Sequence, residues 1–568
     1  MGRISRLWFS FRLDPWGLVG AGLMFMLGLT PSLLPRDFFY QGVVSGIAAG
    51  IGYVTALGVH QVWLRWIHPR LGGAFERLDR LSERTRMRLE VAETVLVVAV
   101  VIGWVLFAVR WQHAIAELTG AEAYSLWTFF LVVPVGFAVF WAMVALGRLL
   151  RRLAHAITAR LPVSERDRRG LGRRLVGWTA VVLLCVFAVE RVIPGTAVRV
   201  GEAVFAGRDA EPEPGVHAPE EPERSGSPDS EIAFDTLGTQ GMSFVDGGLR
   251  AGELEDVSGR PAREPVRVYA GLRSAADVRE RAGLLIDELE RTGARDREAL
   301  LLVMTTGTGW VNPHAAQAFE ALYGGDTAVA AAQYSYLPSA FHFLAGGQRV
   351  QEAGREMITP VVDWWNRLPE DDRPRLYLYG ESLGSSAVES AFSGMRDIAN
   401  SVDGILLTGP PNFNPLWRTF VDRRDPGTRE VDPEYSAGLV VRFAQDAAEV
   451  GALSDDDVEW GPTRMLYIQH PSDPVVWWSP QLLFTEPDWL KEPAGVDRLP
   501  GMTWLPVVTF LQVSADLPVS QNVPQGHGHT YGGALVAGFA AVGGIDDAAR
   551  VADAERTLGA VVDATSSS

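Results

Sequence analysis

Long apolar runs dominate the N-terminal part of the chain and predict helices that cross a membrane. The first run, Trp16 to Leu34, extends over about the 20 residues that a helix needs to cross a hydrocarbon core. It does not resemble a cleaved signal peptide, because its tail, Thr-Pro-Ser-Leu-Leu-Pro, lacks a small-x-small cleavage pattern. Four further runs complete a predicted five-helix domain over residues 1–200: Gly42 to Trp63, Val91 to Phe107, Leu126 to Leu146 and Leu175 to Val189.

Arginine residues are concentrated in the loops after the second and fourth apolar runs. Because positively charged loops are retained on the cytoplasmic side, we expect a cytoplasmic N-terminus. After an odd number of spans, everything beyond Val189 is then expected outside the cytoplasm. An alternative, that these loops bind nucleic acid or lipid, is less favoured. The loop arginines are Arg70, Arg77, Arg80, Arg84, Arg86 and Arg88, followed by Arg148, Arg151, Arg152, Arg160, Arg166, Arg168, Arg169, Arg173 and Arg174.

Beyond the last apolar run, the hydrophobic pattern changes twice. Residues 201–231 are rich in Pro, Glu, Ser and Gly without an apolar period, which predicts a disordered linker. From Ile232 to the end at 568, short β-rich runs alternate with amphipathic helical segments, which is typical of a mostly parallel sheet with helices on both faces. A long acidic insertion near 409–461 predicts a lid. The predicted strands are Val266–Ala270, Ala299–Met304, Thr327–Ala332, Arg375–Tyr379, Gly404–Leu407 and Arg464–Gln469.

Composition supports a membrane protein and excludes several classes of site. The chain has 568 residues, of which 47% are hydrophobic, and its mean hydropathy of +0.08 is high for a purely soluble protein. Its formal net charge of −17 argues against nucleic acid as a partner. Cys185 is the only cysteine, so neither a disulfide framework nor a thiolate zinc site can form within one chain.

One strand-turn-helix junction carries a candidate nucleophile. The β-rich run Arg375–Tyr379 leads into Gly380-Glu-Ser-Leu-Gly384, and a helix-forming segment follows. In such a G-x-S-x-G junction the serine sits in a strained turn, and the glycines avoid collisions with neighbouring backbone. The pentapeptide alone is weak evidence, but its position between a strand and a helix makes Ser382 the candidate nucleophile.

A serine nucleophile needs a base to take its proton and an acid to orient that base. Asp473 follows the last predicted strand and is the candidate acid, although an aspartate before a proline can also simply cap a turn. Two histidines in a Gly-rich loop, His527 and His529, compete for the role of base, and we favour His529 because it lies next to a helix start. Three convergent metal ligands are lacking nearby, so we expect no metal and no other cofactor.

An acyl-transfer site also needs donors for the oxyanion that develops during the reaction. One is expected from the backbone N–H of Leu383, directly after the nucleophile. The other is expected from the glycine-rich loop after an earlier strand, with Gly307 and Thr308 as the candidates. The alternative, an ordinary turn between strand and helix, has equal weight for this loop.

Four longer strings carry a resemblance to a known family. They are Thr306-Gly-Thr-Gly-Trp-Val-Asn-Pro313, Gln333-Tyr-Ser-Tyr-Leu-Pro-Ser339, Leu378-Tyr-Gly-Glu-Ser-Leu-Gly-Ser385 and Pro524-Gln-Gly-His-Gly-His529. Over most of its length the chain resembles the bacterial membrane-anchored α/β-hydrolases, which join a multi-span N-terminal domain to a C-terminal catalytic domain. The resemblance implies an α/β-hydrolase fold fused to an all-α transmembrane domain, but it does not identify a substrate.

These observations lead to one leading functional hypothesis and one alternative. The chain is expected to be a serine esterase, lipase or acyltransferase of the plasma membrane, with a catalytic domain outside the cytoplasm and a Ser-His-Asp triad. Its expected partners are the membrane and a lipid or acyl-ester substrate of the envelope. The alternative is a non-catalytic envelope protein whose hydrolase-like domain binds a lipid or a partner.

Overall fold

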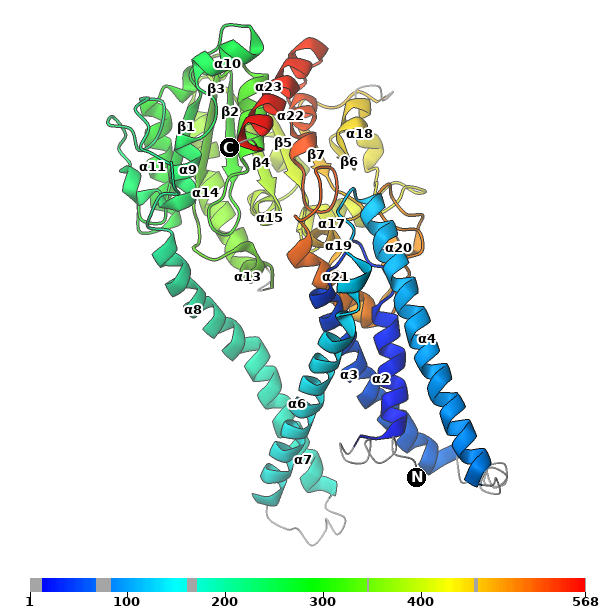
Figure 1. Ribbon diagram of the computed structural model, residues 1–568. Coiled ribbons are helices and arrows are strands. Elements are labelled where there is room, and N and C mark those ends of the chain that lie inside the picture. The colour runs from blue at the N-terminus through cyan, green and yellow to red at the C-terminus, as the bar shows by residue number, and fades with distance from the viewer. Residues whose placement is uncertain (1–12, 68–82, 161–170, 345–346, 454–457, 567–568) are drawn as a thin grey trace. The chain divides into compact units, whose positions relative to one another are not determined.

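The chain folds into two compact units, each of which draws on two stretches of sequence (Figure 1). The computed structural model describes residues 13–67, 83–160, 171–344, 347–453 and 458–566. Met1–Phe187 and Trp478–Val523 form the first unit, called the helical unit here. Ala188–Trp477 and Pro524–Ser568 form the second, called the sheet unit. The boundaries differ from the expected catalytic domain over 232–568, because residues 478–523 pack with the apolar helices.

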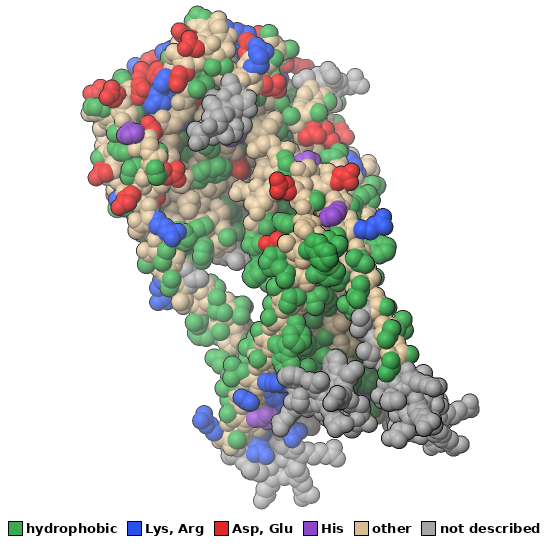
Figure 2. Space-filling model, in the orientation of Figure 1, with side chains coloured by type: hydrophobic (Ala, Val, Ile, Leu, Met, Phe, Trp, Pro, Cys, Tyr) green, Lys and Arg blue, Asp and Glu red, His purple; other side chains and the backbone are tan. Residues whose placement is uncertain are grey.

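Long apolar helices make up most of the helical unit. Among the described residues, four helical stretches are long and apolar enough to cross a membrane: Phe38–Trp66, Ala99–Leu118, Leu126–Arg160 and Gly172–Arg208. Their outward faces are apolar, with side chains such as Val59, Leu106 and Phe137 exposed (Figure 2). The helices are α2 (Pro15–Gly28), α3 (Phe38–Val62), α4 (Glu83–Leu118), α5 (Leu126–Phe129), α6 (Val132–Arg160), α7 (Leu171–Phe187), α20 (Asp488–Lys491) and α21 (Val508–Asp516).

The first of the five expected spans differs from the prediction. Its residues form α2, a helix of 14 residues that is shorter than a full span. The side chain of Asp14 caps the start of α2 by accepting from the N–H groups of Trp16 and Gly17. The helix ends at Gly28, shortly before Pro31, which cannot donate a helical hydrogen bond and disfavours helical geometry in the residue before it.

Glycines bring the helices of this unit into close contact. A Cβ placed on Gly46 of α3 would lie 2.6 Å from the carbonyl oxygen of Gly136 in α6, and one on Gly50 would lie 2.9 Å from the Cβ of Met143. Small residues of this kind allow helix backbones to approach in a membrane, where lipid provides no hydrophobic drive for association. Helix α3 therefore packs with both α2 and α6.

A buried ion pair holds the segment Trp478–Val523 in the helical unit. Asp516, at the end of α21, lies 3.3 Å from Arg36 in the loop between α2 and α3, and both side chains are fully buried. The same carboxylate accepts from the hydroxyl of Ser32 and, at 3.2 Å, from the N–H of Leu33. Gln512 donates at 2.8 Å to the carbonyl of Thr30. The loop after α2 is thus fixed by polar groups that come from the C-terminal half of the chain.

We expect Arg36→Ala to destabilise the helical unit strongly, because it leaves the Asp516 carboxylate buried without a counter-charge. Breaking one partner of a buried pair typically costs about 3–5 kcal/mol. The measurement is the apparent midpoint of thermal unfolding in detergent, with Arg152→Ala, an exposed arginine of α6, as the control. The double variant Arg36→Met with Asp516→Leu should recover part of the loss. Equal midpoints for Arg36→Ala and Arg152→Ala would contradict a stabilising role of the Arg36–Asp516 ion pair.

The sheet unit is built on seven parallel strands in the order β1-β3-β2-β4-β5-β7-β6. The sheet is buried apart from two strand starts, as expected when apolar strands are covered by helices on both faces. The six predicted strands are present, and a seventh, β6, comes from the insertion that predicted only a lid. The strands are β1 (Val266–Ala270), β2 (Ala299–Met304), β3 (Thr327–Ala332), β4 (Arg375–Glu381), β5 (Gly404–Thr408), β6 (Val441–Ala444) and β7 (Arg464–Ile468).

Two sets of helices pack against the sheet, and aromatic contacts show which set lies on which face. The ring centroid of Tyr379 in β4 lies 5.6 Å from that of Phe539 in α22. The ring centroid of Phe539 lies 5.3 Å from that of Phe319 in α12. Helix α23 packs with these two helices, whereas α14 packs with both α11 and α15 in a separate set. The first set consists of α12 (Pro313–Leu322), α22 (Leu535–Gly543) and α23 (Ala548–Ser566), and the second of α11 (Val278–Arg291), α14 (Gln348–Arg367) and α15 (Leu383–Ser390).

Shorter helices complete the sheet unit. Helix α8 leads into it, α17 and α18 lie in the insertion together with β6, and α19 follows the candidate acid. Their bounds are α8 (Ile193–Arg208), α9 (Gly238–Asp246), α10 (Ala251–Ser258), α13 (Ser339–Leu344), α16 (Met395–Ala399), α17 (Pro415–Asp422), α18 (Ala447–Ala452) and α19 (Pro474–Trp477).

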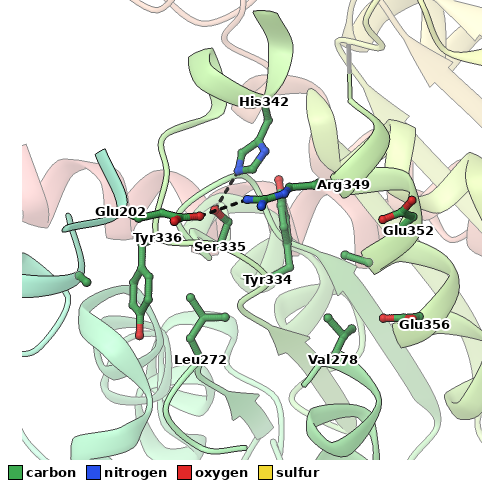
Figure 3. Close-up of a pocket in the computed structure, with 12 residues that line it drawn as sticks. Glu202, Leu272, Val278, Tyr334, Ser335, Tyr336, His342, Arg349, Glu352 and Glu356 are labelled. Carbon is green, nitrogen blue, oxygen red and sulfur yellow. Dashed lines mark hydrogen bonds and ion pairs between the residues drawn. The ribbon is translucent and has the colours of Figure 1, made fainter. Parts of the chain in front are cut away.

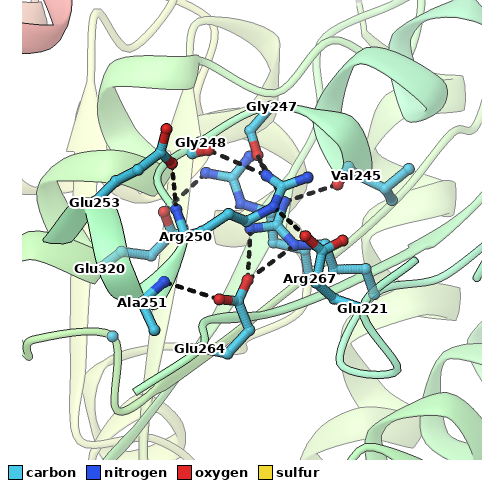
Figure 4. A network of polar contacts seen from close by, with 12 residues as sticks. Glu221, Val245, Gly247, Gly248, Arg250, Ala251, Glu253, Glu264, Arg267 and Glu320 are labelled. Carbon is cyan, nitrogen blue, oxygen red and sulfur yellow. Dashed lines mark hydrogen bonds and ion pairs between the residues drawn. The ribbon is translucent and has the colours of Figure 1, made fainter. Parts of the chain in front are cut away.

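The segment expected to be a disordered linker is folded in part. Helix α8 continues to Arg208, and residues near Arg224 lie along the edge strand β1, where Arg267 donates its N–H to the carbonyl of Glu223 at 3.1 Å. Arg224 is fully buried and donates to the carbonyls of Val245 (2.8 Å) and Gly247 (2.7 Å). The carbonyl of Gly247 also accepts from Arg250 at 3.3 Å (Figure 4). The sequence prediction missed this contact because the low average hydrophobicity of the segment does not reveal a single buried arginine. The residues around Arg224 cover an edge of the sheet that would otherwise be exposed.

Candidate active site

Ser382 lies in a strained turn between β4 and α15. Its φ of 55° and ψ of −123° are unusual for a residue with a side chain, and it is 8% exposed. Its N–H donates at 2.9 Å to the carbonyl of Thr408 at the end of β5. A Cβ on Gly380 would lie 2.5 Å from the carbonyl carbon of Gly384, and a Cβ on Gly384 would collide with the carbonyl oxygen of Met304. The junction has the geometry that the G-x-S-x-G pattern predicts.

Asp473 and His529 are in contact. The Nδ1 of His529 lies 2.7 Å from Oδ2 of Asp473, so the imidazole donates to the carboxylate through this nitrogen. Asp473 also accepts from the hydroxyl of Tyr531 at 2.7 Å and from the N–H of Val475 at 2.8 Å. Asp473 is fully buried and His529 is 5% exposed. With its proton on Nδ1, the neutral imidazole keeps Nε2 as an acceptor, which is the form that a general base requires.

The ring of His529 lies at the same strand ends as Ser382. A Cβ on Gly409 would lie 2.5 Å from Cε1 and 2.8 Å from Nδ1 of His529. Gly409 directly follows Thr408, whose carbonyl accepts from the N–H of Ser382. The imidazole therefore lies at the carboxyl end of β5, the strand end to which the N–H of Ser382 is bonded. The contact with Asp473 belongs to His529, whereas the carbonyl of His527 accepts from the N–H and hydroxyl of Thr530.

The surroundings of His529 favour its charged form. Burial lowers the pKa of the imidazole, but the charge of Asp473 and the hydrogen bond to it together raise that pKa by more, and Glu381 adds to the increase. The net effect is a pKa above the ordinary value. A base of this kind is neutral only at pH values above the raised pKa, and it accepts a proton more readily than an isolated imidazole does.

Sequence reasoning missed the residues that support the pair. Tyr531 bonds to the candidate acid, and its ring stacks on His470 with centroids 4.1 Å apart. Ser472 accepts from the N–H of Gly528 at 2.8 Å, which joins the loop of the acid to the loop of the base. The signal was present, because Ser472 and Tyr531 lie within two residues of Asp473 and His529 in the sequence.

The candidate oxyanion donors are only partly available. Leu383 is the first residue of α15, where an N–H has no partner within the helix. The N–H of Gly307 donates at 3.2 Å to the hydroxyl of Ser339, so it is already engaged. Thr308 lies in the same turn, and its carbonyl accepts from Gln333 at 3.1 Å. Among the described residues, the N–H groups of Leu383 and Thr308 therefore remain the two candidate oxyanion donors.

The sheet unit also contains a pocket of about 450 Å³, and none of the residues that line it belongs to the Ser382 turn (Figure 3). His342 lies 2.9 Å from the hydroxyl of Ser335 within it, and Arg349 pairs with Glu202 at 3.1 Å. Its remaining lining includes Leu272, Val278, Tyr334, Tyr336, Glu352 and Glu356. Within the described residues, no group of three or more His, Cys, Asp or Glu side chains could hold a metal ion.

We expect Gly384→Ala to destabilise the sheet unit, because the added methyl group would collide with a backbone carbonyl that cannot move independently. Overpacking of this kind costs about 1–3 kcal/mol. Gly283→Ala is the matched control, since a Cβ on Gly283 in α11 would meet no atom of another element within 4 Å, and the substitution should gain helix stability. The measurement is the thermal midpoint of the purified protein. Similar midpoints for the two variants would show that the turn has room for a side chain.

Comparisons with known protein families agree with the two-part architecture. A family model described as "Alpha/beta-hydrolase family" matches residues 266–556, slightly more than half of the chain. A second model, described as "Alpha/beta-hydrolase family N-terminus", matches residues 29–248. No curated protein and no solved structure matches the chain.

Proposed function

Because the chain belongs to the alpha/beta-hydrolase family, we propose that it is a membrane-anchored serine hydrolase that cleaves or transfers acyl groups through Ser382. One observation carries the proposal. The buried Asp473–His529 pair lies against Gly409, next to the strand end from which Ser382 projects. Along the chain the serine comes first, the aspartate second and the histidine third, which is the usual order in this superfamily.

In the proposed reaction, the Oγ of Ser382 attacks the carbonyl carbon of an ester while Nε2 of His529 takes its proton. Asp473 holds the imidazole through Nδ1 and stabilises the imidazolium that forms. The N–H groups of Leu383 and Thr308 are the proposed donors to the oxyanion. The tetrahedral intermediate then expels the alcohol, which takes the proton from His529 and leaves an acyl group on Ser382.

The second half of the reaction decides between hydrolysis and transfer. Water or an acceptor alcohol loses a proton to His529, attacks the acyl carbonyl, and releases Ser382 with its proton restored. Acyl esters of envelope or membrane lipids are the proposed substrates. The support for this class is the chain's own membrane anchor, since four apolar helical stretches in the described residues are long enough to cross a bilayer.

The proposed location of the catalytic site is outside the cytoplasm. Arginine-rich loops follow α3 and α6, which favours a cytoplasmic position for these ends. Arg36 lies at the opposite end of α3, and it binds Asp516 of the segment Trp478–Val523. That segment is continuous in sequence with Asp473 before it and His529 after it. This location of the catalytic site is inferred from the two ends of α3, so it is the same with or without a membrane crossing by the shorter α2.

We expect a fluorophosphonate probe to label the purified protein, and Ser382→Ala to abolish the labelling. The probe reacts with serines that an adjacent base has activated, and the substitution removes the attacking oxygen. Ser390→Ala is the matched control, because Ser390 lies in the same helix, α15, and its hydroxyl donates to the backbone carbonyls of Gln351 and Ala387.

Two outcomes would contradict an enzymatic role. They are an unlabelled wild-type protein that is folded by its thermal midpoint, and equal labelling of the wild type and Ser382→Ala. Either result would favour the competing proposal, a non-catalytic envelope protein that uses the same domain to bind a lipid or a partner.

We expect cysteine labelling of intact cells to reveal the orientation. In a Cys185→Ala background, a membrane-impermeant maleimide should label Ala218→Cys in the exposed segment after α8. It should label Ala159→Cys, at the arginine-rich end of α6, only after the membrane is permeabilised. The reverse pattern would place the catalytic site in the cytoplasm.

A further inference from the structure

We propose that Glu381 is a second carboxylate of the catalytic site, which faces His529 and stabilises its imidazolium form. This inference rests on the proposed function, since it assigns a role in the same proton transfer. Glu381 is the residue between Gly380 and Ser382, a position at which the G-x-S-x-G pattern accepts any residue. It acts through His529, so it is a positioning residue rather than a group that touches the substrate.

Two polar side chains hydrogen-bond to Glu381, and a third contacts one of these two. Its Oε2 accepts from Nδ2 of Asn312 at 2.6 Å and from the hydroxyl of Tyr379 at 2.8 Å. The hydroxyl of Tyr379 also lies 3.2 Å from Oγ1 of Thr408. Glu381 is 5% exposed, and the two side chains that hydrogen-bond to it, those of Asn312 and Tyr379, are neutral. It is therefore a buried acidic group that neutral donors hold in one position.

The topology places Glu381 on the same side of the sheet as His529. Side chains alternate along a strand, so Glu381 points to the same face as Tyr379. That face is covered by α12 and α22, since Tyr379 contacts Phe539 of α22 and Asn312 caps the start of α12. The loop that carries His529 leads directly into α22.

The strand register brings the two groups to the same level of the sheet. Glu381 pairs with Thr408 across β4 and β5. The next residue, Gly409, lies against the ring of His529. The titratable side chains that bond to Glu381 or interact with it electrostatically are Tyr379 on β4, His314 on α12 and His529 before α22. Asp473, after β7, and Tyr531 contact His529 itself.

A buried carboxylate without a cationic partner is costly, because neutral donors replace only part of its lost hydration. The cation that compensates Glu381 is the imidazolium that forms when His529 takes the proton of Ser382. That attraction is stronger in the transition state than in the resting enzyme, where the imidazole is neutral, so it lowers the barrier of the chemical step. Neighbouring charges of opposite sign also raise the pKa of a histidine.

The test is the rate of fluorophosphonate labelling of Ser382 as a function of pH, which needs no knowledge of the substrate. Glu381→Gln keeps the size and the hydrogen-bonding oxygen but removes the charge. The pKa of His529 should fall, so the neutral base persists to lower pH and the acid limb of the profile moves to lower pH. The plateau rate at high pH should drop roughly tenfold, which corresponds to about 1.4 kcal/mol of lost transition-state stabilisation.

Tyr379→Phe is the matched control, because it removes one donor from Glu381 without changing any charge near His529. Its acid limb should stay at the wild-type position. Asp473→Asn provides the positive reference, since loss of that charge must move the limb in the same direction as Glu381→Gln. Glu381→Asp, which retains the charge on a shorter side chain, should give a limb between those of the wild type and Glu381→Gln.

The outcomes separate this inference from the proposed function. If the wild type reacts with the probe and the acid limb of Glu381→Gln stays in place, the role of Glu381 is refuted while the hydrolase assignment stands. If the wild type does not react at all, the proposed function itself fails. If Glu381→Gln does not fold, the neutral variant Glu381→Ala takes its place, and an unmoved acid limb in that variant refutes the role.

Discussion

The close approach of backbone at the end of β4 is the constraint on which the candidate site depends. Gly384 packs against the carbonyl of Met304 without room for a side chain, and this contact forces the sharp reversal that presents Ser382. The N–H of Ser382 then bonds to Thr408, which fixes the turn to β5. Gly409, the next residue at that strand end, has no side chain, and the ring of His529 packs directly against its backbone. Steric contacts of the backbone, more than side-chain packing, set the positions of the candidate nucleophile and of its proposed base.

A second constraint links the site to the membrane-associated part of the chain. The candidate acid and base lie on either side of the segment Trp478–Val523, and that segment folds with the apolar helices through the buried pair of Asp516 and Arg36. An ion pair without exposure to water is lost at a high cost when either partner is removed. The chain segments that carry Asp473 and His529 are therefore joined in sequence to a segment that folds with the apolar helices.

Local pattern and chain order predicted much of this arrangement, because both depend on short stretches of sequence. Alternation of apolar runs located six of the seven strands, and the glycines around Ser382 predicted its turn. The strand β6 was missed because its four residues, Val441–Ala444, lie within a polar insertion. Arg224 was missed because a composition average does not register one buried arginine. The choice between His527 and His529, and the positions of Tyr531 and Glu381, depend on contacts between residues far apart in sequence, which no local pattern encodes.

The central claim is that Ser382 carries the acyl group during turnover. The most direct measurement is mass spectrometry of the peptide that contains Ser382, after brief exposure of the full-length protein in detergent to an activated acyl ester and an acid quench. We predict an acyl adduct on Ser382 that appears within the first turnover, decays as free acid or transferred product accumulates, and is absent from Ser382→Ala. Product formation without an adduct at Ser382, or an adduct on another residue, would contradict this claim.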